Sequence, residues 1–293
     1  MTMTPTSSSS FYAPVDDAQR DAFLEGYLQF LHLRDGELDP QTGALANRES
    51  SLQAMNSSPI RYRGRLSQDD FVRLYANFDS SAPQLTPELL VLLTFCKMNA
   101  GEAYGVRVVK AIHQRRHQDD SPLNRAILFA QEEEEYHTRI LVGATHHFDI
   151  QAEGAYLPKL LLKVLIHSIA YAPQPLFHPI LYGAEVAGVY LFNWTLNRLG
   201  DFFQDQPELR VALEQRLIEI LIDEMGHVAF NRLAMGESGR RLGQILASQT
   251  VRGFPFITPE VVALGFDRAV QRQFNRFDLS QLPEEVRQRG FFA

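Results

Sequence analysis

The sequence has few of the features that mark disulfide-stabilised, membrane-spanning or nucleic-acid-binding proteins. A single cysteine, Cys96, excludes an internal disulfide framework. The most apolar run, residues 160–172, is interrupted by Lys163 and His167 and is shorter than the roughly 20 residues that cross a bilayer. The net charge of −7, with scattered Lys and Arg, argues against a nucleic-acid partner. Residues 1–10 lack a basic and apolar leader, so we expect a cytoplasmic protein without a membrane span.

The sequence also lacks sustained two-residue alternation of β-branched residues, which makes an all-α fold the simplest prediction. Helix starts are marked instead. Thr86-Pro87-Glu88 combines an N-cap residue, a first-turn proline and an acid near the positive end of the helix dipole, and Ser121-Pro122 opens a second helix in the same way. Four long helices are therefore predicted, at about residues 86–117, 121–147, 175–200 and 207–236.

The predicted long helices divide the chain into a core and two flanking regions. We expect a disordered tail at residues 1–13 and an accessory region of helices with a long loop at residues 14–85. A four-helix core should follow at residues 86–236, with C-terminal helices packed on it at residues 237–293. Within the accessory region, the segment 35–64 is rich in Gly, Ser, Asn and Pro, and it reads as a surface lid or a linker. A further short helix is expected at Thr258-Pro259-Glu260.

Each of the four long helices carries a glutamate in the middle of its apolar stripe. These residues are Glu102, Glu134, Glu185 and Glu224. The second and fourth helices also carry a histidine three residues later, His137 and His227, on the same helical face. One such Glu-x-x-His motif arises easily by chance, but its repetition beside two more core glutamates points to a shared site.

Burying four converging carboxylates without compensation would cost several kcal/mol each, so the pattern requires cations among them. Two divalent metal ions would balance the four negative charges, and each imidazole would add one nitrogen ligand. Residues that could line a pocket beside this site occur at helical spacing on the same helices. These candidates are Phe95, Met98, His178, Tyr182, Gly188, Val189, Phe192 and Met225.

This ordered set of residues resembles the ferritin-like non-heme di-iron carboxylate oxygenases and oxidases, over about residues 86–236. The resemblance implies a ferritin-like four-helix bundle whose ligands to two iron ions are Glu102, Glu134, His137, Glu185, Glu224 and His227. Manganese uses the same donors. It also implies that Asp223 orients His137 and that Glu133 orients His227, each by accepting the second ring N–H.

Three positions depart from particular branches of this superfamily. Leu141 stands where small reductase subunits have a radical tyrosine, and Gly188-Val189 stand where desaturases and multicomponent hydroxylases place a threonine. Ile220 stands where p-aminobenzoate N-oxygenases carry an extra histidine. Chain length and a stand-alone architecture still make that last group the nearest analogue.

The resemblance implies an oxygenase that uses O₂ as co-substrate to hydroxylate or N-oxygenate a small organic molecule, in secondary metabolism. An external electron donor is expected, and a homodimer is one possible assembly. The alternatives are a di-iron desaturase or oxidase, an iron-storage protein, a manganese catalase, and a non-catalytic helical binding protein. Which substrate is oxidised does not follow from the residues.

Overall fold

The computed structural model describes residues 10–14, 18, 20–38, 45–83, 85–116, 121–151 and 158–292. These residues are almost entirely helical or loop, with one isolated β-bridge between Leu38 and Leu45, so the predicted all-α class is confirmed for them. The α-helices in the described part are α1 (Arg20–Asp35), α2 (Glu49–Asn56), α3 (Gln68–Ala76), α4 (Pro87–Arg116), α5 (Pro122–Gly143), α6 (Leu160–Ala170), α7 (Gln174–Phe202), α8 (Pro207–Ala234), α9 (Glu237–Ile257), α10 (Glu260–Ala263), α11 (Arg268–Gln273) and α12 (Glu284–Arg289). Short 3-10 helices directly follow α5 and α11, at Ala144–Phe148 and Phe274–Arg276, and a third lies at Leu279–Gln281.

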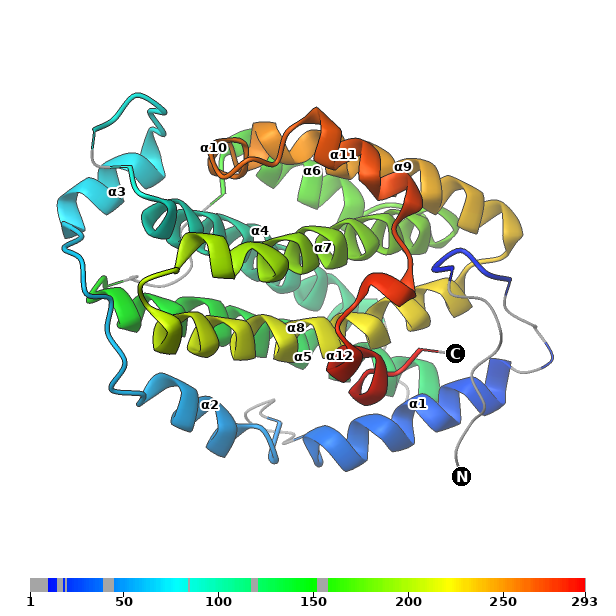
Figure 1. Ribbon diagram of the computed structural model, residues 1–293. Coiled ribbons are helices and arrows are strands. Elements are labelled where there is room, and N and C mark those ends of the chain that lie inside the picture. Colours follow the sequence, from blue (N-terminus) through cyan, green and yellow to red (C-terminus); the bar gives the residue numbers. More distant parts are fainter. Residues whose placement is uncertain are drawn as a thin grey trace.

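The four long predicted helices correspond to α4, α5, α7 and α8. The first turns of α4 and α5 are capped as the sequence predicts, since the Thr86 hydroxyl accepts from Leu89 N at 3.3 Å and the Ser121 hydroxyl accepts from Asn124 N at 3.3 Å. The second helix ends at Gly143, earlier than expected, and the chain continues as a 3-10 helix to Phe148. The four helices run side by side through the centre of the molecule (Figure 1).

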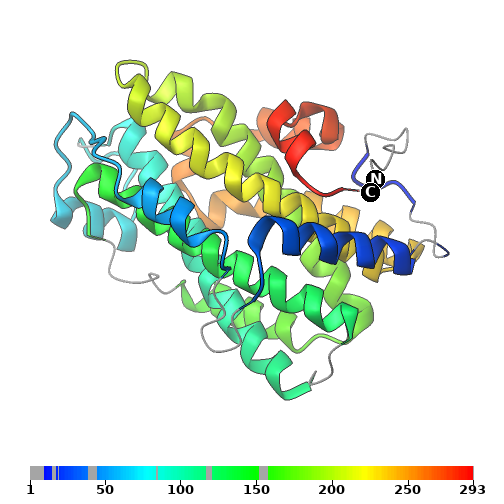
Figure 2. The same ribbon diagram turned by 90° about the horizontal axis from the view of Figure 1, so that it is seen from below.

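Two helix pairs make up this centre. Helix α4 packs on α5, α7 packs on α8, and α5 and α8 are in contact along the middle. In the described part of the chain, α4 and α7 make little backbone contact with each other, and α6 and α9 cover the space between them. On the other side, α1 and α2 lie across α5, as Figure 2 shows.

The contact between α7 and α9 is unusually close because small residues line it. A Cβ at Gly183 would stand 2.9 Å from the Ala247 backbone nitrogen and 3.1 Å from the Gly243 carbonyl oxygen. Neither backbone atom can move away without disturbing its own helix. Glycine at 183 is therefore a packing requirement.

The predicted tail and loop regions are only partly described. Residues 1–9 of the expected disordered tail lie outside the described residues, but Phe11 is packed and fully buried, with its ring centroid 5.3 Å from that of Phe277. Residues 10–13 thus belong to the packed structure, because the Phe11 carbonyl also accepts a 2.6 Å hydrogen bond from the Tyr182 hydroxyl. Among the described residues, no helix combines the length and apolarity needed to cross a bilayer.

Candidate metal centre

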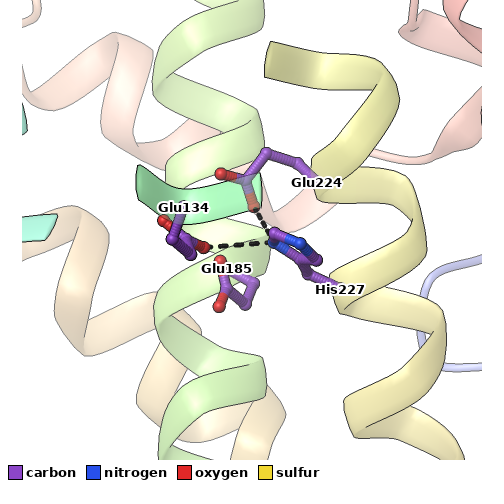
Figure 3. Close-up of side chains that lie close together, drawn as sticks. All are labelled: Glu134, Glu185, Glu224 and His227. Atoms are coloured by element: carbon purple, nitrogen blue, oxygen red, sulfur yellow. Dashed lines mark ion pairs between the residues drawn. The ribbon is translucent and has the colours of Figure 1, made fainter. Parts of the chain in front are cut away.

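Four of the predicted ligands converge on one point. Each of Glu134, Glu185, Glu224 and His227 offers a ligand atom, and these atoms lie within 4.8 Å of one another. Figure 3 shows these side chains meeting from α5, α7 and α8. A spacing of this size matches donor atoms that share one cation, although hydrogen-bonded groups can approach as closely.

The remaining two predicted ligands, His137 and Glu102, adjoin this cluster. His137 Nδ1 lies 3.5 Å from Glu224 Oε1 and 3.7 Å from Glu134 Oε2. Burial, followed by the charges of Glu134 and Glu224, raises the pKa of Glu102 to about 8. Glu102 therefore lies close enough to Glu134 and Glu224 for their charges to affect its pKa.

Glu134 and Glu224 each present one oxygen to each imidazole. Glu134 directs Oε1 to His227 Nδ1 at 3.1 Å and Oε2 to His137, while Glu224 directs Oε2 to His227 Nδ1 at 3.6 Å and Oε1 to His137. The two imidazole centroids are 5.7 Å apart. Two carboxylates standing between two imidazoles in this way is the arrangement needed to bridge a pair of cations.

The imidazoles are held by their other nitrogens. His137 Nε2 donates to Asp223 Oδ2 at 2.9 Å, and His227 Nε2 donates to Glu133 Oε2 at 3.0 Å. Each bond crosses between α5 and α8, as the family resemblance implies. With the proton placed on Nε2, each neutral ring presents the lone pair of Nδ1 towards the glutamates.

Several buried donor atoms in this cluster have no hydrogen-bond partner among the described residues. They are His137 Nδ1, His227 Nδ1, Glu102 Oε2 and Glu224 Oε2. Buried polar atoms are normally paired, and an unpaired buried carboxylate or imidazole nitrogen is costly. Two cations bound among these residues would satisfy all four atoms, so the donor set fits a metal centre.

The electrostatics lead to the same conclusion. Burial, together with Glu224 and Glu134, raises the pKa of Glu185 well above its ordinary value, as it does for Glu102. Burial lowers the pKa of His137, but the hydrogen bond to Asp223 and the nearby carboxylate of Glu134 outweigh it and raise the value to about 10. Without a cation the cluster can approach neutrality only by holding protons, and divalent metals would replace those protons.

Sequence reasoning did not identify the arginines that surround Asp223. Arg48 donates to Asp223 Oδ2 at 3.0 Å and to Asp35 Oδ1 at 2.7 Å, and Arg34 Nη1 lies 2.6 Å from Asp223 Oδ1. Burial raises the pKa of Asp223, but the two guanidinium groups outweigh it and hold the value well below its ordinary range. Arg48 lies in the segment 35–64, where no periodic pattern signals a buried charge.

That segment is therefore not simply a lid or a linker over the surface. Its described part contains α2, and Arg48, directly before α2, is almost completely buried with its guanidinium 4.1 Å from the Tyr136 ring centroid. The segment supplies a charge to the centre from outside the four long helices. Residues 39–44 of it lie outside the described residues.

A cavity of about 550 Å³ adjoins the carboxylates, with Glu102, Glu134, Glu185, Glu224 and His227 in its wall. The remaining wall is mostly aliphatic and comes from α4, α5, α6, α7, α8 and α9. Three predicted pocket residues, Met98, His178 and Gly188, line it. A Cβ at Gly188 or Gly105 would meet no atom within 4 Å, so these glycines leave room in the cavity.

The other predicted pocket residues lie elsewhere. Phe95, Tyr182, Val189, Phe192 and Met225 do not line the cavity and are buried in the hydrophobic core. They share helices with the ligands but face neighbouring helices. Tyr182, for example, packs towards Tyr12 and α9, because its hydroxyl binds the Phe11 carbonyl. Apolar residues near a core glutamate cannot be divided into cavity wall and core by spacing alone.

Comparison with family models, with curated proteins and with solved structures found no match for this chain. Functional assignment therefore depends on the residues of the site and on the cavity beside them.

Proposed function

We propose that this protein is a ferritin-like di-iron oxygenase that uses O₂ to oxidise a small, mainly apolar organic molecule bound in the cavity. The observation that carries the proposal is the direct opening of a buried carboxylate and histidine cluster into an apolar cavity of about 550 Å³. Sites of this volume hold small organic ligands. Hydroxylation or N-oxygenation of such a molecule is the reaction we favour.

The proposed ligand roles follow from the distances. Glu134 and Glu224 would bridge the two metals, because each faces both imidazoles. Glu102 with His137 would complete one metal site, and Glu185 with His227 the other. When bound, iron would supply the redox chemistry that activates O₂. Asp223 and Glu133 would keep the protons of the two histidines on Nε2.

His178 and Asn231 provide the cavity with a polar group of defined hydrogen-bonding character. Asn231 Nδ2 donates to the His227 carbonyl at 3.0 Å, so its Oδ1 accepts from His178 Nδ1 at 3.1 Å. Burial lowers the pKa of His178, which favours the neutral ring. With its proton on Nδ1, His178 keeps Nε2 as an acceptor that would bind a substrate hydroxyl or N–H.

The cavity also distinguishes this proposal from two of the alternatives. Iron storage and peroxide disproportionation need a metal cluster and a path for small ions or peroxide, but neither needs an apolar chamber beside the cluster. A di-iron desaturase or oxidase would need one, so that class remains the second candidate. Analysis of the oxidised product separates it from an oxygenase, because only the oxygenase inserts an oxygen atom.

The proposal is tested by loading the purified chain anaerobically with Fe²⁺, counting bound iron per chain, and then measuring O₂ consumption after air is admitted. We expect two irons per chain. The same sample should unfold at a higher temperature, since a ligand at about 100 times its Kd contributes about 2.7 kcal/mol. Glu134→Ala, which removes a bridging ligand, should abolish stoichiometric binding.

Leu128→Ala is the matched control, because Leu128 lies on α5 with its side chain exposed, outside the cavity wall. A folded wild-type chain that takes up no stoichiometric iron would refute the proposal. Uptake of manganese with release of oxygen from peroxide would support a catalase instead.

A further inference from the structure

Helix α6 is apolar on almost every side. Its inward residues Leu162, Ile166 and Ile169 line the cavity. Its outward residues Leu160 and Leu161 are 77% and 83% exposed. Such a helix is unusual on a protein surface in contact with water alone, because a surface helix normally turns a polar face outwards.

The C-terminal end of α9 has the same character. Phe254 and Ile257 line the cavity, while Phe256 between them is 86% exposed. Leu165 of α6 and Ile257 of α9 both line the cavity and remain exposed, at 50% and 37%. The cavity therefore reaches the surface where these two helices border it.

Exposed apolar side chains are concentrated on this side of the molecule. Of the fourteen large hydrophobic residues that are exposed in the described part of the chain, nine lie within residues 158–184 and 238–259. In Figure 1, α6 and α9 lie at the top, on the side opposite α1 and α2. A concentration of this kind marks an interaction surface, whereas exposed hydrophobic residues that are scattered singly need no explanation.

The same two segments are positively charged in a chain whose net charge is −7. Residues 158–184 and 238–259 contain no Asp or Glu, and they carry Lys159, Lys163, Arg240, Arg241 and Arg252. Arg240 and Arg241 pair with Glu237, but Lys159, Lys163 and Arg252 form no ion pair with a described residue. Exposed apolar groups are thus combined with basic groups that lack a counter-charge.

We infer that α6 and the C-terminal half of α9 form a docking surface for an anionic lipid bilayer. Exposed Leu, Val and Phe beside unpaired Lys and Arg are the composition of segments that lie in the membrane interface. A second copy of this chain suits the surface less well. A two-fold dimer would place this positive patch against itself, whereas anionic lipid supplies the opposite charge.

Docking in this orientation would set the opening of the cavity against the bilayer. If the cavity is the substrate site of the proposed oxygenase, its substrate would be an apolar molecule that partitions into lipid and enters between α6 and α9. This second statement rests on the proposed function. The docking itself does not, because none of the residues that carry it is a predicted metal ligand.

The test is flotation of the full chain with vesicles of phosphatidylcholine alone and with vesicles that also contain phosphatidylglycerol. We expect binding to the anionic vesicles and little to the zwitterionic ones. Lys159→Gln and Lys163→Gln should each weaken binding about fivefold, as expected for about 1 kcal/mol per basic residue near the surface. The double variant Leu160→Gln/Leu161→Gln should weaken it at least about tenfold, from the apolar area withdrawn.

Matched controls lie on other faces. Leu33→Gln alters a leucine of α1 that is 77% exposed, the same as Leu160, and Arg73→Gln alters a half-exposed arginine of α3. Both should bind vesicles like the wild type. Absence of binding to anionic vesicles, or equal weakening by Leu33→Gln, would overturn the inference. So would a dimer, detected by light scattering, that Leu160→Gln/Leu161→Gln dissociates, because a second copy would then occupy the surface.

Glu134→Ala separates the two proposals. It should lose iron and retain vesicle binding. A wild-type chain that floats with anionic vesicles but takes up no iron would leave the docking surface standing and refute the oxygenase.

Discussion

The two histidine–carboxylate pairs of the candidate metal centre are nearly identical in geometry and very different in charge. His137 binds Asp223 at 2.9 Å and His227 binds Glu133 at 3.0 Å, each across α5 and α8. Asp223 is contacted by two arginines, whereas Glu133 forms no ion pair with a Lys or Arg among the described residues. Burial, with the nearby charges of Asp223 and Asp35, raises the pKa of Glu133 to about 8.

The difference shows that the repeated Glu-x-x-His motif and the charged residues around it come from different parts of the chain. The four long helices supply the symmetric part, because the Glu-x-x-His motifs of α5 and α8 face each other. The asymmetric part comes from α1 and the segment before α2. These place Arg34, Asp35 and Arg48 beside the His137–Asp223 pair only. In the metal-free protein, the pKa of Asp223 is therefore held well below its ordinary value, while burial and the neighbouring acids raise that of Glu133 to about 8.

The largest expected effect comes from removing the arginine that makes the pairs different. Arg48→Met leaves Asp35 and Asp223 buried with only Arg34 to compensate both, and breaking a buried ion pair in this way costs about 3–5 kcal/mol. The free energy of unfolding, measured with urea on the metal-free protein, should fall by that amount. Arg139→Met, which breaks the half-exposed pair with Glu49, is the control and should cost about 0.2–1 kcal/mol. Equal losses in both variants would show that the buried ion-pair network contributes no more to the free energy of unfolding than a half-exposed ion pair.

A second comparison exchanges the two carboxylates for amides. Asp223→Asn and Glu133→Gln should each lower iron affinity about 10–100-fold, because each replaces the charged carboxylate that orients a histidine with a weaker, neutral amide acceptor. Only Asp223→Asn should also destabilise the metal-free protein, since it removes one of the buried counter-charges that Arg34 and Arg48 share. Glu133→Gln should leave that stability unchanged or raise it. Iron titration and urea unfolding of the same samples measure both quantities, and similar stabilities for the two variants would contradict the asymmetry.

The smallest expected effect tests whether the asymmetry around the two histidine–carboxylate pairs extends to the cavity. Gly105 on α4 and Gly188 on α7 both line the cavity, and a Cβ at either position meets no atom within 4 Å. Gly105→Ala and Gly188→Ala should therefore both raise stability, by up to about 1 kcal/mol from helix propensity. Gly183→Ala, also on α7, should lower it, because its Cβ would stand 2.9 Å from the Ala247 nitrogen. Thermal unfolding distinguishes these signs, and a loss of stability at Gly188 but not at Gly105 would place a second asymmetry in the cavity itself.

Much of the helical framework could be predicted because its signals are local. Capping by Thr86 and Ser121 depends on residues three positions apart, and proline at the first helical position is favoured whatever the helix packs on. The phase of Glu102, Glu134, Glu185 and Glu224 within the apolar stripes is likewise a property of each helix alone. Whether the chain belongs to the ferritin-like class stays a prediction, which the iron-loading experiment addresses.

The wall of the cavity could not be predicted in this way. Met98 and Phe95 lie one turn apart on α4, yet Met98 lines the cavity and Phe95 lies in the core. The division depends on where α6 and α9 stand, and no residue of α4 carries that information. Arg48 was missed for a similar reason, since one buried arginine in an irregular segment has no period.

The sequence by itself determined which stretches are helical and which helix faces carry carboxylates and histidines, because helix geometry relates residues three and four apart directly. The tertiary structure alone decided which carboxylate receives two arginines, which apolar residues border an open cavity, and which helix exposes its leucines. These features depend on distances between segments far apart in the chain. Burial then sets their energies, since the cost of a charge or the gain from an apolar contact depends on what surrounds it in space.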